Sequence, residues 1–232
     1  MTAVLLDLDG TLLRTPELIG TELAAEVRDL TGRAIEPGRV RRLIGRSLPE
    51  MASSLADGES TLARRISEGY LRRYERNIVP LGRELLYPGV LDTLDVLRGR
   101  GCHAAVVTNK SHTGAVRIMR SSGLSEMIGI VVGADDVVAP KPAPDAIELA
   151  LDLLGGHPDT AVMVGDTSHD VTAGRLAGAA TVAVSYGVGR RAELESADAI
   201  IDLFEALPEA LAEVLDRRTT CTTVGESGEW LR

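Results

Sequence analysis

Aromatic residues are scarce in this sequence: one Trp, four Tyr and one Phe among 232 residues, or 3%. This scarcity argues against stacking platforms for nucleic-acid bases and against aromatic-lined carbohydrate clefts. The formal net charge of −9 also disfavours general binding to nucleic acids or anionic membranes. No apolar run approaches the roughly 20 residues of a membrane-spanning helix, and the N-terminus lacks the basic region of a signal peptide. We therefore expect neither a nucleic-acid nor a membrane partner.

Cysteine and lysine are also rare. Cys102 and Cys221 stand alone, without metal-ligand spacing or a disulfide framework, which fits a reducing cytoplasm. Of the 25 basic residues, only Lys110 and Lys141 are lysines, and the others are arginines. Either codon usage explains this bias, or these two positions require a compact ammonium group.

Short apolar runs alternate with segments of helical character. The runs cover 3–8, 103–108, 128–132, 161–165 and 181–184, and the helical segments cover 90–98, 113–120, 145–154 and 170–176. This alternation predicts an α/β fold with a Rossmann-like parallel sheet. Ligands of such sheets bind beyond the carboxyl ends of the strands, so the chemistry is expected just after each apolar run.

Residues 16–83 differ from the rest, because their apolar residues recur at helical spacing and no strand-like run occurs. Gly and Pro residues divide the segment into about four helices. We expect a helical cap domain at 16–83 and a catalytic core formed by 1–15 and 84–216. The remaining tail, 217–232, is rich in Thr, Gly and Glu and is expected to be disordered.

The first apolar run ends in two aspartates. Asp7 and Asp9 alternate on an extended strand and therefore start on one face, and Gly10 lets the backbone leave the strand close to a ligand. Two neighbouring carboxylates repel each other, and a divalent cation relieves the repulsion. The alternatives are a surface turn or part of a calcium loop. An EF-hand is disfavoured, because Leu18 stands where its terminal Glu would be.

Polar residues also follow the second strand run and precede a later helix. Thr108 and Asn109 offer a hydroxyl and an amide that suit phosphoryl oxygens. Taken alone, the motif is better explained by Ser111 or Thr108 capping the next helix. Prolines on either side of Lys141 fix its backbone and start a helix. The alternative is a solvated loop lysine, and it is disfavoured because the chain has only two lysines.

Two further aspartates follow the run at 161–165. Asp166 and Asp170 lie four residues apart, so both can face one site as the next helix begins. Asp170 could instead cap that helix. His169 lies between them and is expected to face solvent.

Taken together and in this order, the four motifs resemble the haloacid dehalogenase superfamily, in particular its phosphoglycolate phosphatase-like branch with a helical cap. The resemblance spans about residues 3–215 and rests on DLDGT at 7–11, TNK at 108–110, KP at 141–142 and GDTSHD at 165–170. It implies a phosphatase that acts on a small phosphorylated metabolite.

The resemblance also implies roles for the acidic residues. Asp7 is the implied nucleophile that becomes an aspartyl phosphate, and Asp9 is the implied general acid and base. The implied Mg²⁺ is held by Asp7, the backbone carbonyl of Asp9 and Asp166, and Asp170 orients Lys141 or water at the metal.

The phosphoryl oxygens are expected to bind Thr108, Asn109 and the amides after Asp7, including that of Gly10, while Lys141 offsets their charge. Residues 44–47 resemble the substrate-specificity loop of the branch. Arg46 is our candidate for contacting a second anionic or hydroxyl group of the substrate, and a solvated arginine is the equal alternative.

Related activities fit the sequence less well. A dehalogenase does not need Asp9, and a phosphonatase needs a cap lysine that 16–83 lacks. A phosphomutase of the β-phosphoglucomutase type shares both aspartates and stays open, as does a non-catalytic binding or regulatory role. The substrate could be phosphoglycolate-like, a sugar phosphate or a biosynthetic intermediate, and the chain a monomer or a homodimer.

Overall fold

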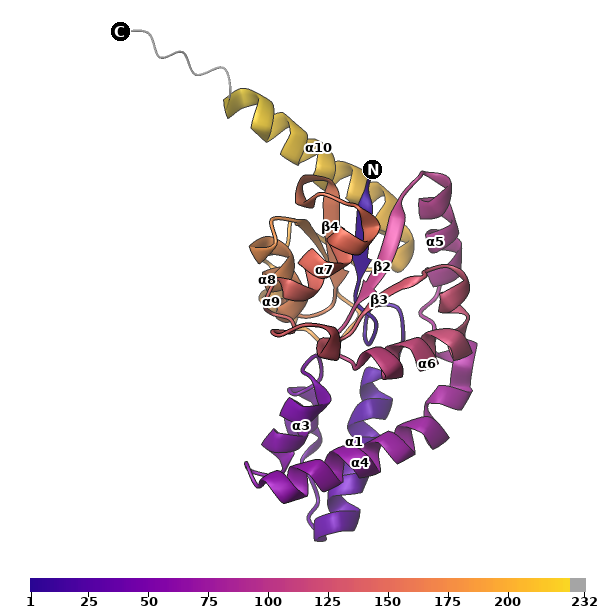
Figure 1. The fold of residues 1–232 in the computed structure, drawn as a ribbon, viewed down its shortest axis with the longest axis vertical. Coiled ribbons are helices and arrows are strands. Elements are labelled where there is room, and N and C mark those ends of the chain that lie inside the picture. The colour runs from indigo at the N-terminus through magenta and orange to yellow at the C-terminus, as the bar shows by residue number, and fades with distance from the viewer. Residues whose placement is uncertain (226–232) are drawn as a thin grey trace, which may run out of the picture.

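A computed structural model describes residues 1–225 of the chain, and it contains a six-stranded, all-parallel sheet (Figure 1). The strand order is β3-β2-β1-β4-β5-β6. The strands are β1 (Ala3–Leu6), β2 (His103–Val107), β3 (Ile130–Val132), β4 (Ala161–Gly165), β5 (Ala180–Val184) and β6 (Ala199–Ile201). The expected Rossmann-like α/β fold is confirmed.

Helices precede, connect and follow these strands. The α-helices are α1 (Pro16–Thr31), α2 (Pro37–Arg41), α3 (Leu48–Leu55), α4 (Ser60–Asn77), α5 (Val90–Gly99), α6 (His112–Ser122), α7 (Asp145–Leu154), α8 (Ser168–Leu176), α9 (Arg191–Leu194) and α10 (Leu207–Gly225). The short 3₁₀ segments are η1 (Val79–Leu85), η2 (Leu124–Glu126), η3 (Ala134–Asp136), η4 (Pro158–Thr160) and η5 (Phe204–Ala206).

The central strand β1 is buried on both faces because helices cover both sides of the sheet. Side chains alternate along a strand, so Val4 and Leu6 join the core that includes α5 and α10. Ala3 and Leu5 join the opposite core, which α7 and α8 complete. All four residues are fully buried, which explains why the run is uniformly apolar rather than alternating.

The strand order reverses direction beside β1, and this reversal places the site. From β1 the chain adds β2 and β3 on one side and then returns to add β4, β5 and β6 on the other. The crossover connections that leave β1 and β4 therefore diverge, which opens a crevice at their carboxyl ends. Asp7 and Asp166 are the first acids beyond those two ends.

The short sixth strand was not expected from the sequence. β6 has three residues, two of them partly exposed, so its apolar signal is weak. The expected strands at 3–8 and 103–108 end one or two residues earlier in the structure, although the amides of Asp7 and Thr108 still donate to carbonyls of neighbouring strands.

Helices α1–α4 lie beyond the carboxyl ends of the strands (Figure 1). Arg73 on α4 ties α4 to α1 through Glu22 at 3.2 Å, Glu26 at 2.8 Å and Asp29. Because the side chain of Arg73 is 19% exposed, water screens these ion pairs less than it screens surface pairs. The division into a core (1–15 and 84–216) and a cap (16–83) stays a prediction.

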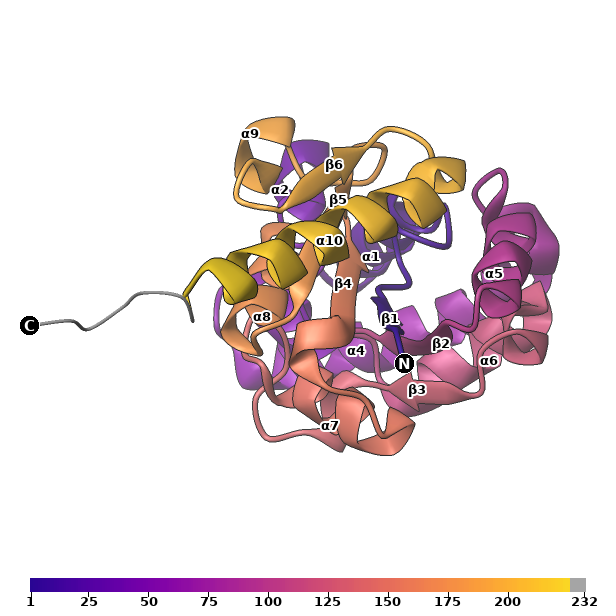
Figure 2. The same cartoon turned by 90° about the horizontal axis from the view of Figure 1, so that it is seen from above.

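The expected disordered tail is wrong for residues 217–225, which continue α10 (Figure 2). The helix is anchored by Leu207, Leu211 and Val214, which are buried at helical spacing and pack on β5 and β6. Beyond them, the Thr219 and Thr220 hydroxyls donate to carbonyls four residues back, so polar residues fit the helix. Residues 226–232 of that prediction lie outside the described residues.

Within 1–225, no helix is long and apolar enough to span a membrane.

We expect the sheet core to set the stability of the fold. Leu6→Ala should lower the free energy of unfolding by about 2–5 kcal/mol, because Leu6 is fully buried on the central strand. Urea titration followed by circular dichroism measures this. The matched control Leu153→Ala removes the same atoms from a side chain that is 56% exposed, and it should change stability by less than about 0.5 kcal/mol. Equal losses would contradict the assigned core.

Candidate active site

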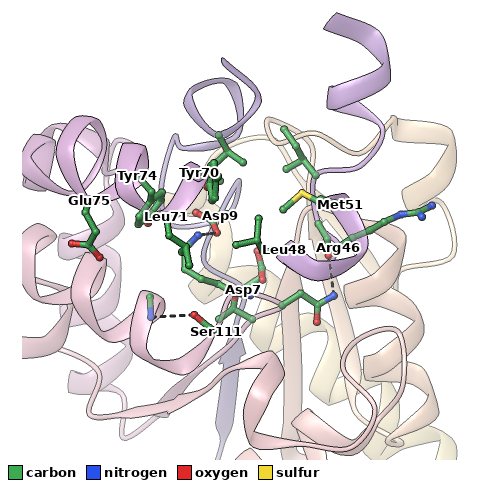
Figure 3. Close-up of a pocket in the computed structure, with 17 residues that line it drawn as sticks. Asp7, Asp9, Arg46, Leu48, Met51, Tyr70, Leu71, Tyr74, Glu75 and Ser111 are labelled. Atoms are coloured by element: carbon green, nitrogen blue, oxygen red, sulfur yellow. Dashed lines mark hydrogen bonds and ion pairs between the residues drawn. The ribbon is translucent and has the colours of Figure 1, made fainter. Parts of the chain in front are cut away.

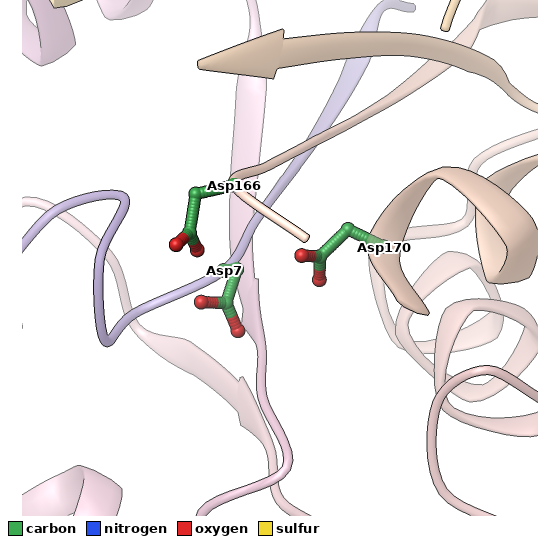
Figure 4. A group of neighbouring side chains, drawn as sticks. All are labelled: Asp7, Asp166 and Asp170. Atoms are coloured by element: carbon green, nitrogen blue, oxygen red, sulfur yellow. The ribbon is translucent and has the colours of Figure 1, made fainter. Parts of the chain in front are cut away.

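Three carboxylates meet at the crevice beyond β1 and β4 (Figure 4). Asp7 follows β1 directly, Asp166 follows β4, and the two strands pair with Leu6 opposite Val164. Asp170 joins them from the first turn of α8. One oxygen from each carboxylate lies within 4.8 Å of the others, and all three residues are buried. The sequence spacing of Asp166 and Asp170 thus brings both acids to one site, as expected.

Lys141 lies against the same carboxylates. Its Nζ donates to Asp7 Oδ1 at 2.8 Å, to Asp170 Oδ1 at 2.6 Å and to the Val107 carbonyl at 2.6 Å. The residue is 4% exposed, so its ammonium has exchanged water for these three acceptors. Burial acts to lower the pKa of Lys141, but Asp170 and Asp7 outweigh it and hold that pKa above its usual value. Lys141 is therefore a permanent cation in this cluster.

Negative charge in the cluster exceeds what one ammonium offsets. Burial raises the pKa of Asp7 to about 7, against the opposing effect of Lys141. Burial also raises the pKa of Asp166 well above its usual range, and the negative charges of Asp7 and Asp170 add to the shift. Buried carboxylates that resist ionisation in this way are stabilised by a further cation.

The donor set fits a hard divalent cation. All the side-chain donors are carboxylate oxygens, which Mg²⁺ and Ca²⁺ prefer over nitrogen or sulfur. Asp166 is held by Thr11 Oγ1, which donates to its Oδ1 at 3.2 Å, and by the Val188 amide, which donates to its Oδ2 at 2.8 Å. A Cβ on Gly10 or Gly187 would lie 2.4 or 2.2 Å from Asp166 Oδ2, so both glycines make room for this carboxylate.

The Asp9 side chain lies outside the three-carboxylate cluster. Its Oδ1 accepts a hydrogen bond from Thr15 Oγ1 at 2.5 Å, and its Oδ2 lies 2.6 Å from Lys110 Nζ. That ammonium also lies 4.6 Å from the centre of the Tyr74 ring. Because both side-chain oxygens of Asp9 have partners, its backbone carbonyl is the group available to a metal ion. The family resemblance implies the same group.

Asn109 lines the same pocket as Asp7 and Asp9, but its amide hydrogens are already used within the protein. Its amide nitrogen donates to the Gly45 carbonyl at 2.9 Å and to the Lys141 carbonyl at 2.8 Å. Both amide hydrogens are thus used within the protein, which makes Asn109 a link between the 44–47 loop and the Lys141 segment. Thr108 is buried beside Asp7 and Asp9 in the same pocket, where its hydroxyl can still donate to a ligand.

Arg46 lines the pocket but is exposed, and its side chain extends away from Asp7 and Asp9 (Figure 3). The contact expected between Arg46 and a second substrate group therefore has no support in this arrangement. His169 is half-buried rather than solvent-facing, because the Gly45 loop packs over it.

Sequence reasoning missed several residues of the site. Thr15, directly before α1, and Tyr74 on α4 contact the Asp9–Lys110 pair, and Val188 supplies a backbone amide from the loop after β5. The rarity of lysine was a usable signal for Lys110. No comparable signal exists for Val188, since a backbone amide leaves no mark on residue type.

The matching family model is that of the haloacid dehalogenase-like hydrolases, and it covers residues 4–184, most of the chain. The chain belongs to this family. A probable phosphatase of Dickeya dadantii is 34% identical over 208 residues, which cover 87% of this chain and 89% of the relative. A phosphoglycolate phosphatase of Cupriavidus necator is 34% identical over 215 residues, 90% of this chain and 93% of the relative.

The fold is shared more widely than the sequence. A β-phosphoglucomutase of Clostridium difficile superposes with a TM-score of 0.84 at 18% identity, covering 95% of this chain and 99% of that one. The relatives named as phosphatases match this chain over most of its length. This member of the haloacid dehalogenase-like hydrolases is therefore a phosphatase, that is, a phosphoric monoester hydrolase. The family typically depends on a metal ion, and the buried acidic cluster can bind one.

The close packing around Asp166 yields a prediction. Gly187→Ala should lower kcat/KM for phosphate release at least about tenfold, because the added methyl group displaces Asp166 Oδ2, and it should cost about 1–3 kcal/mol of stability. Phosphate-release kinetics and thermal melts measure the two effects. Gly99→Ala is the matched control, since its methyl group would meet open space. Unchanged kinetics in Gly187→Ala would show that Asp166 does not need its present position.

Proposed function

We propose that this phosphatase is a Mg²⁺-dependent phosphomonoesterase that works through an aspartyl phosphate on Asp7. The contact of Lys141 with both Asp7 and Asp170, beside Asp166, carries the proposal. This arrangement brings one carboxylate nucleophile, one fixed cation and two further acids together in a buried crevice. The substrate class is a small phosphorylated metabolite.

Asp7 is the proposed nucleophile. A carboxylate oxygen of Asp7 forms a bond to phosphorus while the bond from phosphorus to the leaving oxygen breaks. Lys141 and Asp170 fix the orientation of Asp7, and the Lys141 ammonium offsets the charge of the incoming phosphate. Mg²⁺, held by Asp7, Asp166, the Asp9 carbonyl and water fixed by Asp170, would supply further positive charge at the phosphoryl oxygens. The Thr108 hydroxyl is the proposed hydrogen-bond donor to these oxygens. The amide of Gly10, expected to share this role, instead donates to the Leu13 carbonyl at 2.8 Å.

Asp9 is the proposed general acid and base. It gives a proton to the leaving oxygen and later accepts one from the water that hydrolyses the aspartyl phosphate. In the structure both of its oxygens are occupied, one by Thr15 and one by Lys110. Proton transfer to the substrate therefore requires the leaving oxygen to replace one of these partners.

A phosphomutase would use the same two aspartates but would return the phosphoryl group to another hydroxyl of the sugar. The fold similarity to a β-phosphoglucomutase concerns the fold alone. Measuring phosphate release against sugar-phosphate isomerisation separates the activities, and isomerisation without release would overturn the phosphatase proposal.

Trapping the intermediate tests the role of Asp7. Acid quench during turnover of p-nitrophenyl phosphate, followed by borohydride reduction, should convert Asp7 to homoserine, because borohydride reduces acyl phosphates. Peptide mass spectrometry detects this product. Asp7→Asn should lose at least about 1,000-fold in kcat and give no homoserine, whereas Asp152→Asn, an exposed acid on α7, should behave as wild type. Phosphate release without homoserine at position 7 would contradict the mechanism.

Metal binding should depend on pH through Asp7. The folded-state pKa of about 7 exceeds the usual 3.8, so the stability that protonated Asp7 contributes is complete below about pH 4 and lost as the pH rises through 7. Mg²⁺ must displace that proton, so the rise in Tm on adding Mg²⁺ should be larger at pH 8 than at pH 6. Thermal melts with and without Mg²⁺ measure this, with NaCl at equal ionic strength as the control. Equal rises at both pH values would contradict the assignment.

A further inference from the structure

The pocket above Asp7 and Asp9 has an apolar wall contributed by the helical segment (Figure 3). Leu48 and Met51 on α3 point toward the aspartates, and Tyr70, Leu71 and Tyr74 on α4 form the facing side. The pocket has a volume of about 70 Å³, less than half of the roughly 150 Å³ of an apolar cavity that holds benzene. The space next to the nucleophile thus suits a compact group with apolar carbons.

Next to Asp7 and Asp9, the described residues of this pocket place no free cation. Lys110 lines it, but its ammonium lies 2.6 Å from Asp9 Oδ2 and packs on the Tyr74 ring. Arg46 lines it too, with a side chain that extends away from Asp7 and Asp9 (Figure 3). The third charged residue of the wall is an acid, Glu75, which Arg117 neutralises at 2.6 Å. In this arrangement, a second anionic group of the substrate that lies beside Asp7 and Asp9 would find no free cation.

One neutral polar group is present in the wall. The Tyr74 hydroxyl is buried and has no hydrogen-bond partner within the part of the chain that the structure describes. Burial raises the pKa of Tyr74, so the hydroxyl stays neutral. The Tyr74 hydroxyl therefore adds a polar group but no charge to the wall.

We propose that the substrate is a phosphomonoester whose leaving group is compact and uncharged, with apolar carbons and no second anionic group. This inference rests on the proposed function. A carboxylate or a second phosphate entering the pocket would lose its water without gaining a cation, whereas apolar carbons gain by leaving water. This chain should therefore differ in substrate from the Cupriavidus necator relative that is named for phosphoglycolate, although the two sequences are 34% identical.

A pair of esters of matched shape tests the leaving-group charge directly. Isobutyl phosphate and phosphoglycolate share the phosphoester and its methylene, and they differ in a neutral isopropyl group against a carboxylate. We expect kcat/KM for isobutyl phosphate to exceed that for phosphoglycolate at least about tenfold. Pyrophosphate, whose leaving group is a phosphate, should be turned over no faster than phosphoglycolate.

Adding a cation to the wall should reverse this preference. Leu48→Lys should shift the ratio of the two kcat/KM values at least about tenfold toward phosphoglycolate, because the new ammonium pairs with its carboxylate. Leu71→Lys is a second variant that the fold should tolerate, since Leu71 is already 45% exposed. Leu176→Lys is the matched control: Leu176 is 63% exposed on α8, outside the pocket, and the ratio should not change.

The outcomes separate this inference from the proposed function. If phosphate release from the preferred ester survives in Asp7→Asn, the proposed function fails. If Asp7→Asn abolishes release but wild type prefers phosphoglycolate or pyrophosphate, only the inference fails. A ratio that moves equally in Leu71→Lys and Leu176→Lys would also overturn it, because the effect would then be one of overall charge.

Discussion

Like charges are forced together at the carboxyl ends of β1 and β4, and much of the surrounding structure serves to make this tolerable. Asp7, Asp166 and Asp170 are buried within 4.8 Å of one another, where water cannot screen their repulsion. Lys141 offsets part of the charge, while Thr11 and the Val188 amide donate to Asp166. Such a site is costly for folding, and the negative charge that it fixes can bind a metal ion.

The two lysines of the chain occupy the two places where an ammonium suits the geometry better than a guanidinium. Lys141 directs three hydrogens at three acceptors from different segments: Asp7, Asp170 and the Val107 carbonyl. A planar guanidinium presents its donors in one fixed fork and cannot converge on acceptors arranged in this way. Lys110 places a compact charge between Asp9 and the Tyr74 ring. Elsewhere arginine provides the positive charge, as Arg73 does in its ion pairs with three acids on α1.

The sequence predicts those parts of the site that depend on single strands and misses those that depend on contacts between distant segments. Asp7, Thr108 and Asp166 each follow an apolar run, and parallel strands bring their carboxyl ends together, so the cluster could be foreseen. The hydrogen bond from Asn109 to Gly45 could not be foreseen, because Gly45 lies 64 residues away in the helical segment. The end of α10 was missed because its Thr residues are typical of loops, yet their hydroxyls bond to helix carbonyls.

Chemistry and selectivity reside in different parts of the chain. The residues proposed to act on phosphorus come from the loops after β1, β2 and β4 and from the Lys141 segment, whereas the wall facing the leaving group comes from α3 and α4. Asn109 joins the two parts by donating to carbonyls on both sides, at Gly45 and Lys141. Substitutions in α3 and α4 can therefore change which leaving group fits while the acidic cluster stays intact. For this reason, similarity to a relative over the whole chain is better evidence for the reaction at phosphorus than for the identity of the substrate.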